Sequence, residues 1–222
     1  MKIQIYTMQT PDEACVLAAL GVDHLGVTPS DRGLPGEIDF TTARAICAAV
    51  IGRAVTVALS VERDPDLIAA MVDAVQPDVL HLCGLTGTFS PEQVRALRVR
   101  LPQVKIMQAI SVAGPEAIPA ALSYQDAADF LILDTQAAHI AGIGASGQTH
   151  DWTISREIVR QSRLPVILAG GLSPENVADA IRAVRPWGVD SLTHTNRLLP
   201  GGGFRKDQDR VRQFVETARG AE

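Results

Sequence analysis

The stretch Leu131-Ile132-Leu133-Asp134-Thr135 decides how this chain can fold. Three consecutive large aliphatic residues are typical of a strand that is buried on both faces, as the strands of a parallel sheet are. The run ends in a carboxylate, so Asp134 stands where the strand emerges and its side chain can meet a ligand. We therefore take Asp134 as a candidate catalytic residue. The simpler alternative is a surface aspartate that caps the next turn.

Apolar runs of this kind alternate with helical patterns along the whole chain. Strands are expected over residues 2–6, 23–27, 54–60, 79–83, 104–109, 128–133, 165–169 and 188–192. Helices are expected over residues 11–20, 41–51, 64–75, 91–101, 115–122, 153–162, 174–184 and 207–219. Such alternation predicts βα units and a parallel sheet. Eight unbroken units favour the α/β fold of a closed (βα)8 TIM barrel, as a single domain over residues 1–222, rather than a doubly wound open sheet.

The composition excludes several classes of function. The 222 residues are 46% hydrophobic, enough for one sizeable core, and the net charge is −5. Since Lys and Arg form no run, we expect neither a nucleic-acid partner nor a membrane partner. The three cysteines share no CxxC spacing, which argues against a disulfide framework or a zinc site. With no signal peptide and no long apolar span in the pattern, we expect a cytoplasmic protein.

A closed barrel carries its site at the C-terminal ends of its strands. The loop over residues 141–149 follows Asp134 and contains three glycines with hydroxyl and amide side chains. Its backbone N–H groups can therefore approach an anion closely. Gly144, Ser146, Gly147 and His150 are predicted to bind substrate. The alternative is a glycine-rich loop that only turns the chain.

Two further segments predict a phosphate site. Gly170 and Gly171 come directly before a helix N-terminus, where free N–H groups favour an anion. Thr193 and His194 follow the last strand and supply a hydroxyl group and a possible cation. Phosphate often binds between the loops after strands seven and eight of such barrels, so the two segments predict one shared site.

Three other side chains lie at or just beyond strand ends. Arg32 is in the long loop after the second strand, where its planar fork could hold a carboxylate. His81 and Cys83 are two residues apart on the fourth strand and therefore face the same side. The alternatives are a surface arginine, a hydrogen-bonded core histidine and a cysteine that acts as a small buried hydrophobe.

Nearly the whole chain resembles the phosphoribosylanthranilate isomerase family. The resemblance is strongest in Leu131-Ile132-Leu133-Asp134-Thr135, in Ser146-Gly147-Gln148-Thr149-His150-Asp151-Trp152 and in Ala169-Gly170-Gly171-Leu172-Ser173-Pro174-Glu175-Asn176. It implies an enzyme of the tryptophan-biosynthesis type that converts a phosphorylated sugar amine by an Amadori rearrangement, without cofactor or metal, as a monomer or homodimer. It also implies that Asp134 is the general acid and that Arg32 holds the anthranilate carboxylate.

One position departs from the family pattern in a way that affects the chemistry. The resemblance places Tyr6 where the family has a cysteine that acts as general base, and Thr7 where it has glycine. A phenol, with a reference pKa of about 10, is a poorer base at neutral pH than a thiol at about 8.5. Cys83 or His81 could replace it, with a protonated His81 stabilising the Cys83 thiolate. With Tyr6 in the base position we expect activity on the family's substrate to be weak or absent, and expect Tyr6→Cys, alone or with Thr7→Gly, to raise it.

Three hypotheses about function follow from these residues. The first is the isomerase reaction itself, with Asp134 as acid. The second is an isomerase or epimerase of a different phosphorylated sugar, served by the histidines. The third is a non-catalytic protein that binds a phosphorylated metabolite. A metal site built from His81, Cys83 and His194 is conceivable by ligand type but lacks a spacing motif, so no metal is expected.

Overall fold

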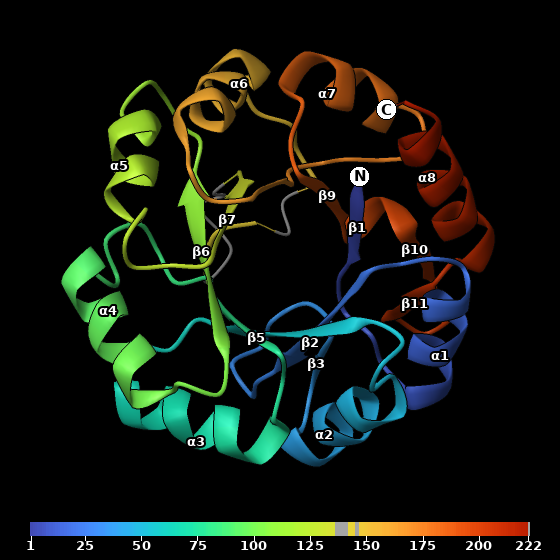
Figure 1. Ribbon diagram of the computed structural model, residues 1–222. Helices are drawn as coiled ribbons and strands as arrows, with labels where there is room; N and C mark the ends of the chain where they lie inside the picture. The colour runs from blue at the N-terminus through green and yellow to red at the C-terminus, as the bar shows by residue number, and fades with distance from the viewer. Residues whose placement is uncertain (136–141, 145–146, 222) are drawn as a thin grey trace.

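The predicted barrel is confirmed by a computed structural model, which describes residues 1–135, 142–144 and 147–221. Its eight parallel strands surround a common axis (Figure 1). Their order is β1-β9-β8-β7-β6-β5-β4-β2, and pairing of β1 with β2 closes the ring. The strands are β1 (Lys2–Ile5), β2 (His24–Pro29), β4 (Val55–Ser60), β5 (Val79–Leu82), β6 (Lys105–Ser111), β7 (Phe130–Asp134), β8 (Val166–Leu168) and β9 (Gly188–Ser191).

Helices pack around the outside of the strands, one after each strand (Figure 1). Three of them have a side-chain cap followed by proline at their start, where the side chains of Thr10, Asp64 and Ser90 accept a hydrogen bond from the first helical turn. The helices are α1 (Pro11–Ala19), α2 (Phe40–Ala49), α3 (Pro65–Val75), α4 (Pro91–Arg100), α5 (Ala117–Ser123), α6 (Trp152–Gln161), α7 (Val177–Val184) and α8 (Gln208–Gly220).

Helix α7 begins three residues later than the sequence suggests. The predicted start was residue 174, but the Ser173 N–H donates to Asn176 Oδ1 over 2.8 Å and closes a turn there. The Asn176 amide also donates to the Gly171 carbonyl over 3.0 Å. This turn therefore keeps the chain between β8 and α7 close to the strand end instead of continuing the helix.

The core has two parts. The larger lies between the strands and the helices, and the smaller fills the barrel interior. Interior residues come from several strands, including Val57, Val79, Met107, Ile132 and Ile167. Because these side chains close the interior, the barrel is a packed core rather than a pore, and a ligand has access only at its ends.

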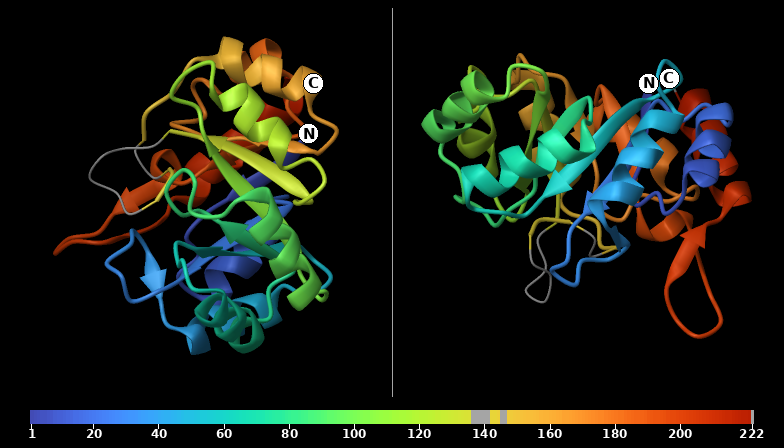
Figure 2. Two further views of the ribbon diagram at one scale, coloured as in Figure 1. Left: turned by 90° about the vertical axis from the view of Figure 1, so that its left-hand side faces the viewer. Right: turned by 90° about the horizontal axis from the view of Figure 1, so that it is seen from below.

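Three short strands were not predicted. β3 (Glu37–Ile38) extends the sheet beside β2, and β10 (Asn196–Leu198) pairs with β11 (Phe204–Lys206) as an antiparallel hairpin. Figure 2 shows the hairpin projecting from the barrel beyond β9. Gly201, Gly202 and Gly203 at its tip all have positive φ, a conformation that glycine adopts without strain. The chain can therefore turn tightly between the two strands. No helix in the part of the chain that the structure describes could cross a membrane.

Candidate active site

A cavity at the C-terminal end of the barrel is lined by six of the thirteen predicted site residues. Asp134 from β7 and Asp190 from β9 line it together with the loops that follow β8 and β9. Gly147, Gly170, Gly171, Thr193 and His194 are also in its wall. The cavity therefore combines carboxyl groups with the segments predicted to bind phosphate. Ser146, also predicted here, lies outside the described residues.

Asp134 is the last residue of β7, as the sequence suggests. Burial raises the pKa of its carboxyl group to about 7, although the Thr135 N–H opposes this by donating to Oδ1 over 2.7 Å. Gly144 covers the carboxylate so closely that a Cβ there would collide with Asp134 Oδ2, and its φ of 105° also favours glycine. Gly144 thus covers Asp134, whose carboxyl group can both give and take a proton near neutral pH.

The sequence analysis missed Asp190. It lies on β9, is only 6% exposed, and its Oδ1 has no hydrogen-bond partner among the described residues. Burial raises the pKa of its carboxyl group to about 8, and the charge of Asp134 adds to this. The sequence signal was weaker than for Asp134, because Asp190 lies within the expected strand 188–192 and not just past its end.

The loop after β8 is shaped to present N–H groups. Gly170 and Gly171 have φ of 83° and 61°. Gly171 approaches the loop after β7 closely, since a Cβ there would lie 2.7 Å from the Gln148 carbonyl carbon. The N–H groups of Gly170, Gly171 and Leu172 have no acceptor among the described residues. These donors line the cavity and suit a phosphate.

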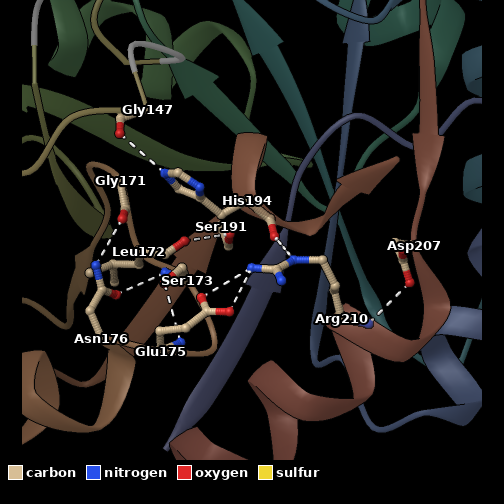
Figure 3. A network of polar contacts seen from close by, with 10 residues as sticks. All are labelled: Gly147, Gly171, Leu172, Ser173, Glu175, Asn176, Ser191, His194, Asp207 and Arg210. Atoms are coloured by element: carbon tan, nitrogen blue, oxygen red, sulfur yellow. Dashed lines mark hydrogen bonds and ion pairs between the residues drawn. The ribbon is translucent and has the colours of Figure 1, made fainter. Parts of the chain in front are cut away.

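A network of hydrogen bonds ties this loop to the loop after β9 (Figure 3). Ser191 Oγ donates to the Leu172 carbonyl over 2.8 Å. His194 Nε2 donates to the Gly147 carbonyl over 3.1 Å, which fixes the tautomer because a carbonyl can only accept. Arg210 Nε on α8 donates to the His194 carbonyl over 2.6 Å, and the same guanidinium pairs with Glu175. The loops after β8 and β9 are therefore held in place by contacts within the protein.

Lys206 on β11 is a second functional candidate that the sequence did not suggest. Its ammonium is buried and donates to Asn196 Oδ1 over 2.6 Å and to the Leu192 carbonyl over 3.0 Å. Burial lowers its pKa to about 7, with Glu13 and Asp190 acting in the opposite direction. The hairpin thus places a cation behind the loop after β9.

Tyr6 and His81 form a buried pair across the barrel. The Tyr6 ring lies so close to Gly26 that a Cβ there would overlap it, and its hydroxyl is 2.6 Å from His81 Nδ1. Burial raises the pKa of Tyr6 well above its usual value and lowers that of His81 to about 3. Thr7 has a φ of 68°, the left-handed conformation that suits the glycine of the family. Both rings are neutral, so Tyr6 is a poor base in this position.

Cys83 faces the barrel interior on the same side as His81, as the spacing predicts. Its thiol donates to the Ile143 carbonyl over 2.8 Å, and burial raises its pKa. The expected stabilisation of a Cys83 thiolate by a protonated His81 is wrong, because a His81 with a lowered pKa carries no charge at neutral pH.

His150 and Arg32 are not in the wall of this cavity. His150 lies behind Gly170, with Nε2 2.7 Å from Ser155 Oγ and Nδ1 3.2 Å from Thr135 Oγ1. Burial lowers its pKa to about 4, so it supports the loops as a neutral ring. Arg32 is exposed and forms an ion pair of 2.8 Å with Glu62 at a neighbouring cavity.

Comparison with known proteins adds to this geometry. A family model described as N-(5'phosphoribosyl)anthranilate (PRA) isomerase matches residues 38–217. The N-(5'-phosphoribosyl)anthranilate isomerase of Methanocella arvoryzae is 34% identical over 98% of both chains. Isomerase 2 of Methanosarcina mazei is 32% identical over 99% of this chain and 94% of its own. A crystal structure of monomers made from the dimeric isomerase of Thermotoga maritima is 25% identical, with a TM-score of 0.81 over 99% of both chains.

Proposed function

The chain belongs to the N-(5'-phosphoribosyl)anthranilate isomerase family, and from this we propose that it catalyses the Amadori rearrangement of phosphoribosylanthranilate in tryptophan biosynthesis. The reaction is that of an intramolecular oxidoreductase, an aldose–ketose isomerase that works without a cofactor. The observation that carries the proposal is the position of Asp134, whose pKa of about 7 suits acid–base catalysis and which faces a cavity walled by anion-binding loops.

In the proposed reaction Asp134 is the general acid. Its protonated carboxyl group donates to the ring oxygen of the aminated ribose, and the sugar ring opens. Gly144 lies directly against the carboxylate and so limits the access of water to this proton transfer. The 1-amino-1-deoxyketose forms once a second group removes the proton from C2.

The phosphate of the substrate is proposed to bind between Gly170-Gly171 and Thr193-His194. Thr193→Glu should lower the affinity for inorganic phosphate by about tenfold or more, because it adds a like charge within a few ångströms of the anion. Phosphate affinity would be measured by calorimetry. Ser123→Glu, at the far end of α5 beside the N-terminal ends of the strands, is the matched control and should bind phosphate as the wild type does. Equal affinity in Thr193→Glu would contradict the assignment.

Arg32 is proposed to hold the anthranilate carboxylate. Its guanidinium already binds one carboxylate, that of Glu62, and it is exposed enough to exchange this for a ligand. Arg32→Ala should raise KM for phosphoribosylanthranilate about tenfold or more with a smaller change in kcat, since a hydrogen bond to a charged group contributes about 1.5–3 kcal/mol. Steady-state kinetics test this, and an unchanged KM would remove Arg32 from the site.

The direct test of the function is complementation of a tryptophan auxotroph that lacks this isomerase, together with turnover of phosphoribosylanthranilate by the purified protein. We expect growth and turnover. A soluble, folded protein that supports neither would overturn the proposal. We further propose that the whole chain works as one domain in the cytoplasm, as a monomer or as a homodimer, for which the dimeric Thermotoga maritima relative gives support.

A further inference from the structure

The reaction needs a base, and the groups expected to supply it are buried and neutral in this chain. Asp190 is a buried carboxyl group in the same cavity that the acid step does not use. Its Oδ1 is shielded from solvent and has no hydrogen-bond partner among the described residues. The Gln4 side chain, beside it on β1, favours the ionised form of the carboxyl group and so opposes part of the rise in its pKa. A buried, unpaired polar atom of this kind calls for a functional explanation.

Strand register places Asp190 beside Asp134. Leu133 on β7 aligns with Leu168 on β8, which aligns with Val189 on β9. The next residues on these three strands are Asp134, Ala169 and Asp190. Ala169 therefore lies between the two aspartates, and its side chain is only a methyl group. Neighbouring strands are about 4.8 Å apart, so the two backbones are separated by about 10 Å. Both carboxyl groups line the cavity and can contact one ligand from different sides.

On its other flank Asp190 adjoins the strand that carries the family's base. Gln4 on β1 aligns with Asp190, and Tyr6 lies one inward-facing position further along β1. Tyr6 occupies the position of the missing cysteine, and the Asp190 charge contributes to the raised pKa of its hydroxyl. Asp190 is therefore next to the place from which the family's cysteine would act.

We propose that Asp190 is the general base of the rearrangement and that it removes the C2 proton in place of the family's cysteine. The inference rests on the proposed function. With this base in place, the weak activity expected from Tyr6 no longer follows. Turnover at ordinary enzyme rates becomes the expectation.

The proton transfers balance within the substrate. Asp134 gives its proton to the ring oxygen, the C1–O bond breaks and the nitrogen lone pair forms a C=N bond. Asp190 then takes the C2 proton, the C2–H electrons form a C1=C2 bond, and the C=N electrons return to nitrogen. The resulting enol loses its hydroxyl proton while C1 gains one, which yields the ketose. Asp134 is then ionised and Asp190 protonated, and transfer of one proton from Asp190 to Asp134 through water restores the starting state. No electron leaves the substrate, so no redox partner is needed.

The two carboxyl groups titrate in the same pH range and must be treated as a pair. Burial raises the pKa of Asp134 to about 7 and that of Asp190 to about 8. Between these values the pair holds about one proton. Because Asp190 has the higher pKa, it carries this proton more often than Asp134 does, so the productive form, with Asp134 protonated and Asp190 ionised, is the minor of the two one-proton forms.

Gln4 and Lys206 oppose the rise in the pKa of Asp190, and hydrogen bonds hold Lys206 behind the loop after β9. Tyr6 and Cys83 also face the pair and stay neutral. His194 lines the cavity as well.

The pH dependence of kcat follows from this pair. Below about pH 7 both groups are protonated and the base is lost, whereas above about pH 8 both are ionised and the acid is lost. The wild type should therefore show a bell-shaped profile. Asp190→Asn should lose the fall on the acid side, and Asp134→Asn the fall on the alkaline side.

The test compares Asp190→Asn with Asp134→Asn on ordinary substrate and on substrate deuterated at C2. Asp190→Asn should lower kcat by about 10²–10⁴-fold with little change in KM, and its C2 isotope effect should rise because proton removal becomes limiting. In Asp134→Asn ring opening becomes limiting, so the isotope effect should stay near one. Asp78→Asn, at the N-terminal end of β5, is the matched control and should keep wild-type kinetics.

Two further results keep the outcome decisive. If Asp190→Asn does not fold, Asp190→Ala in added formate is used instead, and formate should restore part of the turnover. Suppose that the wild type is active. If the Asp190 variants keep their rate, or lose it without a larger isotope effect and without formate rescue, then Asp190 is not the base, while the proposed function stands. A wild type that does not turn over phosphoribosylanthranilate at all would overturn the proposed function, and this inference with it.

Discussion

Asp134→Asn is expected to lower kcat for phosphoribosylanthranilate by about 10²–10⁴-fold while it leaves substrate affinity nearly unchanged. The amide has the shape of the carboxyl group, and its oxygen can still accept the Thr135 N–H bond that Asp134 Oδ1 accepts over 2.7 Å. An amide cannot give up a proton to the ring oxygen at neutral pH. Ring opening therefore loses its acid while the phosphate contacts remain.

The fold should tolerate this change well. Burial raises the pKa of Asp134 to about 7, which is above the pKa of the same group in the unfolded chain. The folded state therefore disfavours the ionised carboxylate, and the protein loses stability as the pH rises through the pKa of the folded state. Asn carries no charge. The melting temperature of Asp134→Asn should therefore equal or exceed that of the wild type at pH 8, measured by circular dichroism.

The matched control for this variant is Asp151→Asn. Asp151 caps α6 by accepting the Thr153 N–H over 2.8 Å, and asparagine is an equally good cap. It lies at the end of the same loop but is exposed and outside the cavity wall. This control should keep its turnover. Full activity in Asp134→Asn would be incompatible with the acid role proposed for Asp134.

Tyr6→Cys is expected to lower the free energy of unfolding by about 3–5 kcal/mol, as other large-to-small changes of aromatic core residues do. The Tyr6 ring is only 3% exposed and packs against Gly26 inside the barrel. Its loss leaves a cavity that a thiol cannot fill. It also leaves His81 Nδ1 without the hydroxyl that lies 2.6 Å away.

Tyr6→Phe separates these two contributions. It keeps the ring and removes only the hydroxyl, so the cost should be about 1–3 kcal/mol for one unpaired buried group. Denaturant unfolding of both variants measures the difference. Equal stability losses would mean that the ring does not support the barrel interior. If Asp190 is the base, Tyr6→Cys should not raise kcat, contrary to the expectation from family resemblance alone.

The sequence was sufficient to predict the barrel and part of its site. Strand and helix patterns depend on hydrophobic period and on capping residues such as Thr10 and Ser90, which act within a few residues of themselves. In a parallel barrel all strands end on one face, so Asp134 and Gly170-Gly171 could be assigned to a common site before any contact was known. The hairpin of β10 and β11 was missed because its strands are short and its tip is rich in glycine.

Only the tertiary structure decided which side chains could do chemistry. Tyr6 contacts His81, which is 75 residues further along the sequence, and Arg32 contacts Glu62, which is 30 residues further along. No local pattern encodes either pairing. The pKa values of Asp134, Asp190 and His81 depend on burial, which is set by strand register and by the loops that close over the barrel end. Residue type suggested Cys83 and His81 as reagents, but burial made them neutral and left two carboxyl groups, two strands apart, facing one cavity.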